Sequence, residues 1–120
     1  MSDLTTHTGG CHCGKVRYTV RLDLSAPAIT CNCSICSKTG TMLAFVTAEQ
    51  FTLESGEDAL TDYQFYRMKV HHLFCSTCGI RSFAHGVGPD GKEVRAINVR
   101  CLDDFELEKV PTKHVNGRAA

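Results

Sequence analysis

The sequence contains eight cysteines, and three of them lie within one six-residue segment. Cys31, Cys33 and Cys36 follow the pattern Cys-x-Cys-x-x-Cys. A thiolate is a soft anionic ligand that suits zinc, and this spacing can place three sulfurs around one tetrahedral ion. Structural zinc sites are closed by four protein ligands, whereas catalytic sites keep one position for water or substrate. The segment supplies three ligands and therefore predicts a catalytic zinc site.

Two further cysteine pairs predict a second, structural site. One residue separates Cys11 from Cys13, and two residues separate Cys75 from Cys78. Seven clustered thiols exceed the four that a single zinc binds, so we expect two Zn²⁺ ions per chain. The four paired cysteines can saturate one ion and join distant parts of the chain. Structural zinc contributes about 10 kcal/mol or more in small peptides, which is comparable with the whole stability of a domain.

Other assignments of the thiols are possible. A histidine (His71, His72 or His85) or Cys101 could close the three-cysteine site and make it structural. An iron–sulfur cluster is compatible with the ligands, but the usual run of four cysteines is absent. Disulfides are disfavoured because Cys-x-Cys pairs rarely have suitable geometry and because reducing compartments keep thiols free.

The charge on a three-thiolate site indicates sulfur chemistry. Three anionic sulfurs give the zinc a formal charge of minus one, so it is a poorer Lewis acid for water than a zinc held by imidazoles. It can still hold a substrate thiol as the more nucleophilic thiolate. The site therefore favours activation of a thiol over hydrolysis.

The length and charge of the chain restrict its organisation and partners. A chain of 120 residues suits one domain, which we place at residues 9–110, after a flexible segment (1–8) and before a polar tail (111–120). Lys plus Arg and Asp plus Glu both number 13, so no strong field attracts nucleic acid or anionic lipid. The first ten residues do not resemble a signal peptide, and no apolar run is long enough to span a membrane. We therefore expect a cytoplasmic protein; no sequence signal indicates its oligomeric state.

The elements that must position the thiols are short strands. Residues 15–22 alternate, with Val16, Tyr18, Val20 and Leu22 on one face, which is typical of a half-buried strand. No window of twelve residues keeps a helical apolar period. The pattern predicts a mainly β fold of short antiparallel strands. Its other expected parts are strands at 42–47, 50–53, 60–68, 70–74, 80–85, 94–99 and 105–110, a connector at 24–30, turns at 11–14, 54–58, 75–79 and 88–91, and a helical turn at 37–40 ending at Gly40.

Four segments of the sequence resemble one known family. They are residues 9–18 (GGCHCGKVRY), 31–40 (CNCSICSKTG), 72–79 (HLFCSTCG) and 96–103 (AINVRCLD). In this order and spacing they resemble the glutathione-dependent formaldehyde-activating (GFA) enzyme family, which includes centromere protein V. The likeness covers residues 9–106, and the cysteine spacing makes it specific.

The resemblance carries expectations about fold and activity. It implies an Mss4-like, zinc-stabilised β fold, with the structural ion on Cys11, Cys13, Cys75 and Cys78 and the catalytic ion on Cys31, Cys33 and Cys36. It also implies a carbon–sulfur lyase that condenses glutathione, or a similar small thiol, with an aldehyde such as formaldehyde. Glutathione is anionic and needs a basic group nearby, for which Lys38, Arg67 and Arg81 are the candidates.

Two other functions compete with an enzyme. The first is a non-catalytic protein-interaction module in which both zinc ions are structural; Cys36→Ala would then destabilise the protein as much as Cys78→Ala. The second is nucleic-acid binding through zinc knuckles, which needs a basic patch that the balanced charge does not favour.

Overall fold

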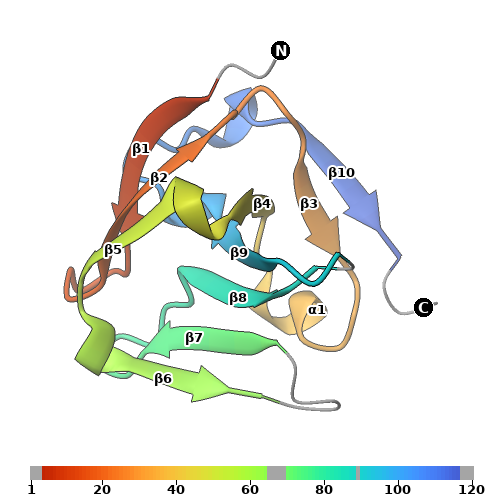
Figure 1. The fold of residues 1–120 in the computed structure, drawn as a ribbon. Helices are drawn as coiled ribbons and strands as arrows, with labels where there is room; N and C mark the ends of the chain where they lie inside the picture. The colour runs from red at the N-terminus through yellow and green to blue at the C-terminus, as the bar shows by residue number, and fades with distance from the viewer. Residues whose placement is uncertain (1–3, 65–69, 89, 117–120) are drawn as a thin grey trace.

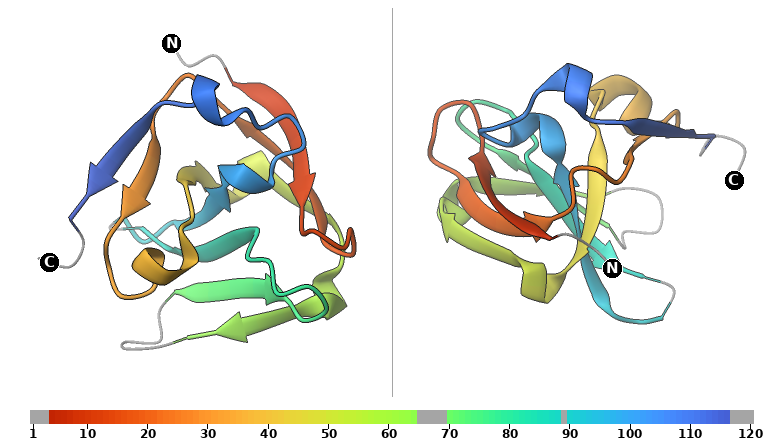
Figure 2. Two further views of the ribbon diagram at one scale, coloured as in Figure 1. Left: turned by 180° about the vertical axis from the view of Figure 1, so that it is seen from behind. Right: turned by 90° about the horizontal axis from the view of Figure 1, so that it is seen from above.

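The computed structural model describes residues 4–64, 70–88 and 90–116. Over these residues the chain is mainly β, with ten strands in two sheets and a few short helical turns (Figures 1 and 2). The predicted fold class is therefore confirmed. Residues 65–68 of the expected strand at 60–68, including Arg67, and Pro89 of the expected turn at 88–91 lie outside the described residues.

A three-stranded antiparallel sheet has the order β1-β2-β5. It consists of β1 (Thr5–Gly10), β2 (Arg17–Leu22) and β5 (Phe51–Ser55). Within β2, Tyr18, Val20 and Leu22 are buried and alternate with more exposed residues, because successive side chains of a strand point to opposite faces. The alternation in the sequence therefore predicted this strand correctly.

The second sheet has seven strands in the order β10-β3-β4-β9-β8-β7-β6. Its pairs are antiparallel except β10 with β3, which is parallel. The strands are β3 (Ala28–Cys31), β4 (Leu43–Thr47), β6 (Leu60–Tyr63), β7 (His71–Cys75), β8 (Phe83–Val87), β9 (Glu93–Asn98) and β10 (Thr112–Val115). The helical elements are α1 (Cys36–Thr39) and the 3-10 turns η1 (Ala48–Gln50), η2 (Glu57–Ala59), η3 (Val99–Cys101) and η4 (Leu107–Lys109).

The hydrophobic core contains residues of both sheets. At its centre the rings of Tyr18, Phe51 and Phe83 meet in pairs, with centroids 4.7 to 6.0 Å apart. Such contacts add about 0.5–1.5 kcal/mol per pair beyond the area they bury. Cys11 and Cys75 belong to the same buried cluster. The core therefore fixes one cysteine of each pair.

Three expected irregular segments are instead strands. Residues 5–8, expected to be flexible, belong to β1, which pairs with β2 along its whole length. The expected tail and connector contribute β10 and most of β3, which pair with each other. The N–H of Ala28 donates to the Pro111 carbonyl at 2.9 Å, just before this pair. Backbone hydrogen bonds hold these segments, so the proposed boundaries at 8 and 111 do not mark the ends of ordered structure.

The strand expected at 105–110 is wrong. Residues 107–109 form η4, with the N–H of Lys109 donating to the Glu106 carbonyl at 3.0 Å. The apolar residues of this segment do not share a buried face, since Leu107 is 53% exposed whereas Val110 is buried. The strand expected at 80–85 begins only at Phe83, because Ile80 still belongs to the turn after β7 and accepts a hydrogen bond from the N–H of Cys75.

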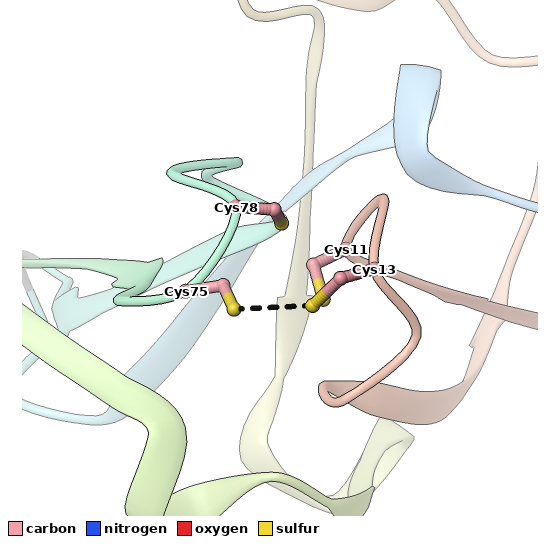
Figure 3. A group of neighbouring side chains, drawn as sticks. All are labelled: Cys11, Cys13, Cys75 and Cys78. Atoms are coloured by element: carbon pink, nitrogen blue, oxygen red, sulfur yellow. Dashed lines mark hydrogen bonds between the residues drawn. The ribbon is translucent and has the colours of Figure 1, made fainter.

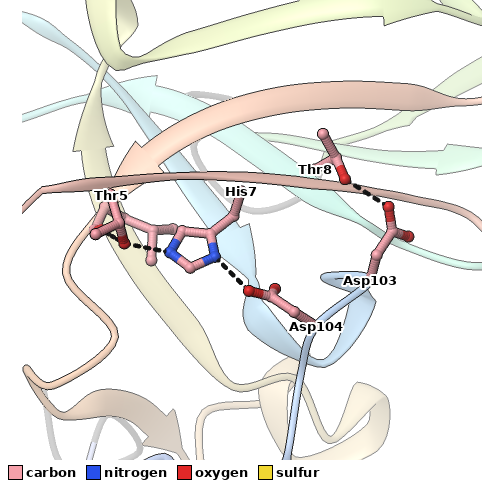
Figure 4. A network of polar contacts seen from close by, with 6 residues as sticks. Thr5, His7, Thr8, Asp103 and Asp104 are labelled. Atoms are coloured by element: carbon pink, nitrogen blue, oxygen red, sulfur yellow. Dashed lines mark hydrogen bonds and ion pairs between the residues drawn. The ribbon is translucent and has the colours of Figure 1, made fainter.

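Polar contacts attach β1 to the segment after η3 (Figure 4). Thr8 Oγ1 donates to Asp103 Oδ2 at 2.6 Å, and His7 Nδ1 lies 2.8 Å from Asp104 Oδ2. Arg17, on β2, forms a two-pronged ion pair with Asp103. The Arg17 hydrogen bond, with help from Thr8, holds the pKa of the Asp103 carboxyl below its usual value.

We expect a double-mutant cycle with Arg17→Met and Asp103→Asn to give a small coupling energy. Both side chains are substantially exposed, so the value should be about 0.5–1 kcal/mol in low salt and should decrease in 1 M NaCl. Because the folded pKa of Asp103 is depressed, this contribution is full above the unfolded pKa and is lost as the pH falls through the folded pKa. Urea denaturation at neutral pH measures the coupling, and a value unaffected by salt would contradict the electrostatic explanation.

Candidate metal centres

Four cysteine sulfurs converge between the β1–β2 loop and the turn after β7 (Figure 3). The Sγ atoms of Cys11, Cys13, Cys75 and Cys78 all lie within 4.8 Å of one another. Cys13 Sγ is 3.6 Å from both Cys11 Sγ and Cys75 Sγ. A tetrahedral zinc with Zn–S bonds of about 2.3 Å places its sulfurs about 3.8 Å apart, whereas a disulfide brings them to about 2.05 Å. All eight cysteines are free thiols, and this cluster has the spacing of a metal site.

Two glycines shape the turns that carry these thiols. Gly14 has a φ of +87° and Gly79 a φ of +78°, a left-handed conformation that glycine adopts without strain. The N–H of Gly79 donates to the Cys75 carbonyl at 2.7 Å and closes the turn between the second pair of cysteines. Each predicted turn therefore brings its two sulfurs to the same point.

Backbone N–H groups aim at several of the four sulfurs. The N–H of Val16 lies 3.3 Å from Cys11 Sγ. Backbone hydrogen bonds from Ile80 and then Cys13 lower the pKa of the Cys78 thiol to about 6. The backbone N–H of Cys78 likewise lowers the pKa of Cys75. Donors that favour the thiolate favour metal binding as well, because the thiolate is the form that binds a metal.

The second cluster lies where β3 leads into α1. Cys31 is the last residue of β3, Cys33 lies in the following turn, and Cys36 is the first residue of α1. Their three Sγ atoms lie within 4.8 Å of one another, and all three residues are partly buried. The helix ends at Gly40, which has a φ of +67° and donates its N–H to the Cys36 carbonyl at 3.0 Å. The predicted helical turn is confirmed.

The three thiols of this cluster do not ionise equally. Burial, followed by the neighbouring thiols Cys33 and Cys31, raises the pKa of Cys36 to about 11. Burial also opposes ionisation of Cys33, but the backbone N–H and the thiol of Cys36 outweigh it and lower its pKa. Three adjacent thiolates in a partly buried site require a compensating cation. A soft divalent ion such as zinc supplies that charge, so the residues fit the metal.

One basic side chain lies at this cluster. The guanidinium of Arg81 lies close enough to Cys36 and Cys33 for their charges to favour its protonated form. Its Nη1 atom is buried and has no hydrogen-bond partner. Burial lowers the pKa of Arg81, and the two thiols oppose that shift. Of the other basic candidates, Lys38 is exposed on α1, and Arg67 lies outside the described residues.

No fourth ligand from residues 4–64, 70–88 or 90–116 joins the three sulfurs: no other donor atom of His, Cys, Asp or Glu belongs to the group. His71 Nδ1 instead lies 2.6 Å from Asp62, and its ring packs against His85 with centroids 4.6 Å apart. His72 is buried on β7, where burial and then Arg81 lower its pKa. Cys101 Sγ lies 3.5 Å from Asn98 Nδ2.

Asn98 has a supporting role that the sequence did not reveal. Its Nδ2 donates to the Arg81 carbonyl at 3.0 Å, and its Oδ1 accepts from the N–H groups of Met42 at 3.4 Å and Arg100 at 3.3 Å. The side chain therefore holds the backbone of Arg81, whose guanidinium lies beside Cys36 and Cys33. The only signal in the sequence was a polar residue directly after the apolar pair Ala96–Ile97.

The two sheets and the two cysteine clusters define a class, the Mss4-like β proteins with clustered cysteine ligands. Residues 6–117 match the family model described as "Glutathione-dependent formaldehyde-activating enzyme". The chain belongs to this GFA family. It is also similar to a crystal structure of a Rhodobacter sphaeroides protein from structural genomics, with 33% sequence identity and a TM-score of 0.75. The match covers 88% of this chain and 99% of that one.

Within residues 4–64, 70–88 and 90–116, no helix has the length and apolar character that crossing a bilayer requires.

Proposed function

We propose that the protein is a zinc-dependent enzyme of the carbon–sulfur lyase type that joins a small thiol, such as glutathione, to an aldehyde, such as formaldehyde. Cys31, Cys33 and Cys36 would hold the catalytic zinc. Cys11, Cys13, Cys75 and Cys78 would hold a second, structural zinc. The observation that best supports this proposal is the convergence of three sulfurs, without a fourth ligand from the described residues, beside the partly buried side chain of Arg81.

In the reaction, the thiol sulfur bonds to the aldehyde carbon while the carbonyl π electrons move to oxygen. The thiol loses its proton to solvent, and the new alkoxide takes up a proton to give the hydroxymethyl thioether. When bound, zinc supplies a Lewis-acidic centre that favours the thiolate form of the substrate. The Arg81 guanidinium, which lies beside Cys36 and Cys33, would donate a hydrogen bond to the negative charge on the sulfur and then on the oxygen.

The surroundings of Cys36 help to exclude water. Its side chain packs against a small apolar cluster formed by Leu43, Ala84 and Ala96. An apolar surface that excludes part of the water lowers the local dielectric constant and so strengthens the electrostatic effect of Arg81 on the reacting groups. The same chemistry requires reduced thiols, so we propose that the enzyme works in the cytoplasm.

The direct test is exchange NMR on the zinc-loaded protein with formaldehyde and glutathione. We expect interconversion of free glutathione and its hydroxymethyl adduct to be faster than the spontaneous reaction, and the acceleration to disappear when the zinc is removed. An exchange rate equal to the spontaneous rate would refute the formaldehyde–glutathione activity.

We expect Arg81→Met to lower kcat/KM by about 10- to 100-fold, the value of a hydrogen bond to a charged group. Zinc content should stay unchanged, and Arg81→Lys should recover part of the activity because it restores the charge. Steady-state kinetics with metal analysis measures both effects. Arg21→Met, on the exposed side of β2, is the matched control and should behave as wild type. An active Arg81→Met variant would exclude Arg81 from the reaction.

A further inference from the structure

The seven-stranded sheet has a row of small residues on the face away from the core. Phe45 pairs with Ala96, Ala96 with Ala84, and Ala84 with His72, across β4, β9, β8 and β7. Paired residues share a face, and the intervening residues Val46, Ile97, Phe83 and Leu73 pack into the core on the other face. In this row, Ala96 and Ala84 therefore lie between the exposed ring of Phe45 and the imidazole of His72.

The two alanines belong to the lining of an apolar trough of about 380 Å³. The lining consists of Phe45, Val70, Ala84, His85, Gly86, Val87, Gly88, Val94 and Ala96. Phe45 is 58% exposed, Val70 44% and Val87 63%, so several exposed apolar side chains gather at this place. The volume is within the range of small-molecule sites, about 300–1,000 Å³.

The trough shares two residues with the surroundings of the three-cysteine cluster. Cys36 packs against the apolar cluster of Leu43, Ala84 and Ala96, and Ala84 and Ala96 also line the trough. Arg81 lies beside Cys36 and Cys33 and provides a positive charge there. Among the described residues, the lining of the trough contains one histidine, His85, and no carboxylate, lysine or arginine. The surface is thus cationic beside the sulfurs and apolar beyond them.

We infer that the preferred thiol of this site carries a short alkyl or aryl substituent, which lies in the trough while its sulfur binds beside Cys31, Cys33 and Cys36. This inference rests on the proposed function and specifies its substrate class. An apolar thiol suits both surfaces: its only anionic group, the thiolate, would lie near the positive charge of Arg81, and its apolar substituent would lie in the trough. The carboxylates of glutathione would meet no lysine or arginine among the described residues that line the trough.

The inference predicts how affinity depends on chain length. Burial of a methylene group is worth about 0.8 kcal/mol, which corresponds to about fourfold tighter binding per added methylene. We expect this gradient from ethanethiol to pentanethiol in the zinc-loaded full chain, measured by NMR titration with labelled alanine methyl groups. The signals of Ala84 and Ala96 should shift on binding.

Two variants that fill the trough and one that truncates Phe45 test whether the substituent of the thiol binds there. Gly86→Leu and Val94→Phe should remove the chain-length gradient but leave ethanethiol binding unchanged, because both positions line the trough and neither belongs to the cluster that contacts Cys36. A side chain at Gly86 first meets Val70 at 3.6 Å, an ordinary contact. Phe45→Ala should weaken pentanethiol binding several-fold. Leu107→Ala, which truncates another exposed apolar side chain, is its matched control and should have no effect.

The outcomes separate the inference from the proposed function. Equal affinity for all the thiols, or an unchanged gradient in both filling variants, would overturn the inference even if the glutathione reaction is catalysed. A gradient without catalysis would support the trough and refute the activity. Self-association that is abolished by Phe45→Ala in sedimentation would show that a second copy covers this face, and would also overturn the inference.

Discussion

The Cys78→Ala variant is expected to lose its folded state at 25 °C. Cys78 supplies one of four sulfurs that join the β1–β2 loop to the turn after β7, and Cys11 and Cys75 of the same cluster lie in the core. Three remaining thiols cannot close a structural zinc site. Metal binding contributes about 10 kcal/mol or more in small zinc domains, whereas a whole domain is stable by about 5–15 kcal/mol. Loss of the structural zinc should therefore remove most or all of the free energy of unfolding of the domain.

Circular dichroism with metal analysis measures this effect. We expect no cooperative thermal transition and a zinc content well below that of wild type. Cys101→Ala is the matched control, because this cysteine belongs to neither cluster; it should keep both metal ions and most of the stability. A folded Cys78→Ala protein with a full metal content would exclude a structural role for the four-sulfur cluster.

The Cys33→Ala variant is expected to lose activity but to keep its fold. Cys33 lies in a partly exposed turn outside the core cluster, so its truncation should cost about 1–2 kcal/mol. Two sulfurs would hold the catalytic zinc poorly, and the loss of its charge stabilisation should lower kcat/KM on the order of 10³-fold. Exchange NMR for activity and urea denaturation for stability measure the two effects separately.

Ser34→Ala, in the same loop, is the control for Cys33→Ala and should be fully active because its exposed hydroxyl group does not belong to the cluster. If Cys33→Ala destabilises the protein as much as Cys78→Ala, both ions are structural. The protein would then be a zinc-stabilised interaction module without catalysis.

The sequence predicted the parts of the fold that depend on side-chain chemistry. Alternation in residues 15–22 reflects the buried face of β2, and glycines follow the cysteine pairs where left-handed turns occur. The spacing of the seven thiols anticipated the two groups of sulfurs that the structure brings together. Each of these features depends on a short segment and on a particular residue type, so it can be recognised in the sequence.

Long-range backbone pairing could not be predicted in this way. β1 and β10 have largely exposed side chains, so no apolar pattern distinguishes them from loops, and their partners are far away in the sequence. The trough depends on the register that sets Ala84 opposite Ala96, and the position of Arg81 is supported by the hydrogen bond from Asn98, which lies far away in the sequence. Nothing in the sequence near these residues specifies those relations.

The four-sulfur cluster also constrains the order in which the molecule assembles during synthesis. Cys11, Cys13 and the three-cysteine loop all emerge from the ribosome well before Cys75 and Cys78. Until translation reaches the second pair, five exposed thiols of a nascent chain compete for any metal ion. A metal ion captured early by a mixture of these thiols would have to exchange ligands before the four-sulfur site could close, so this topology opens a route to misfolding.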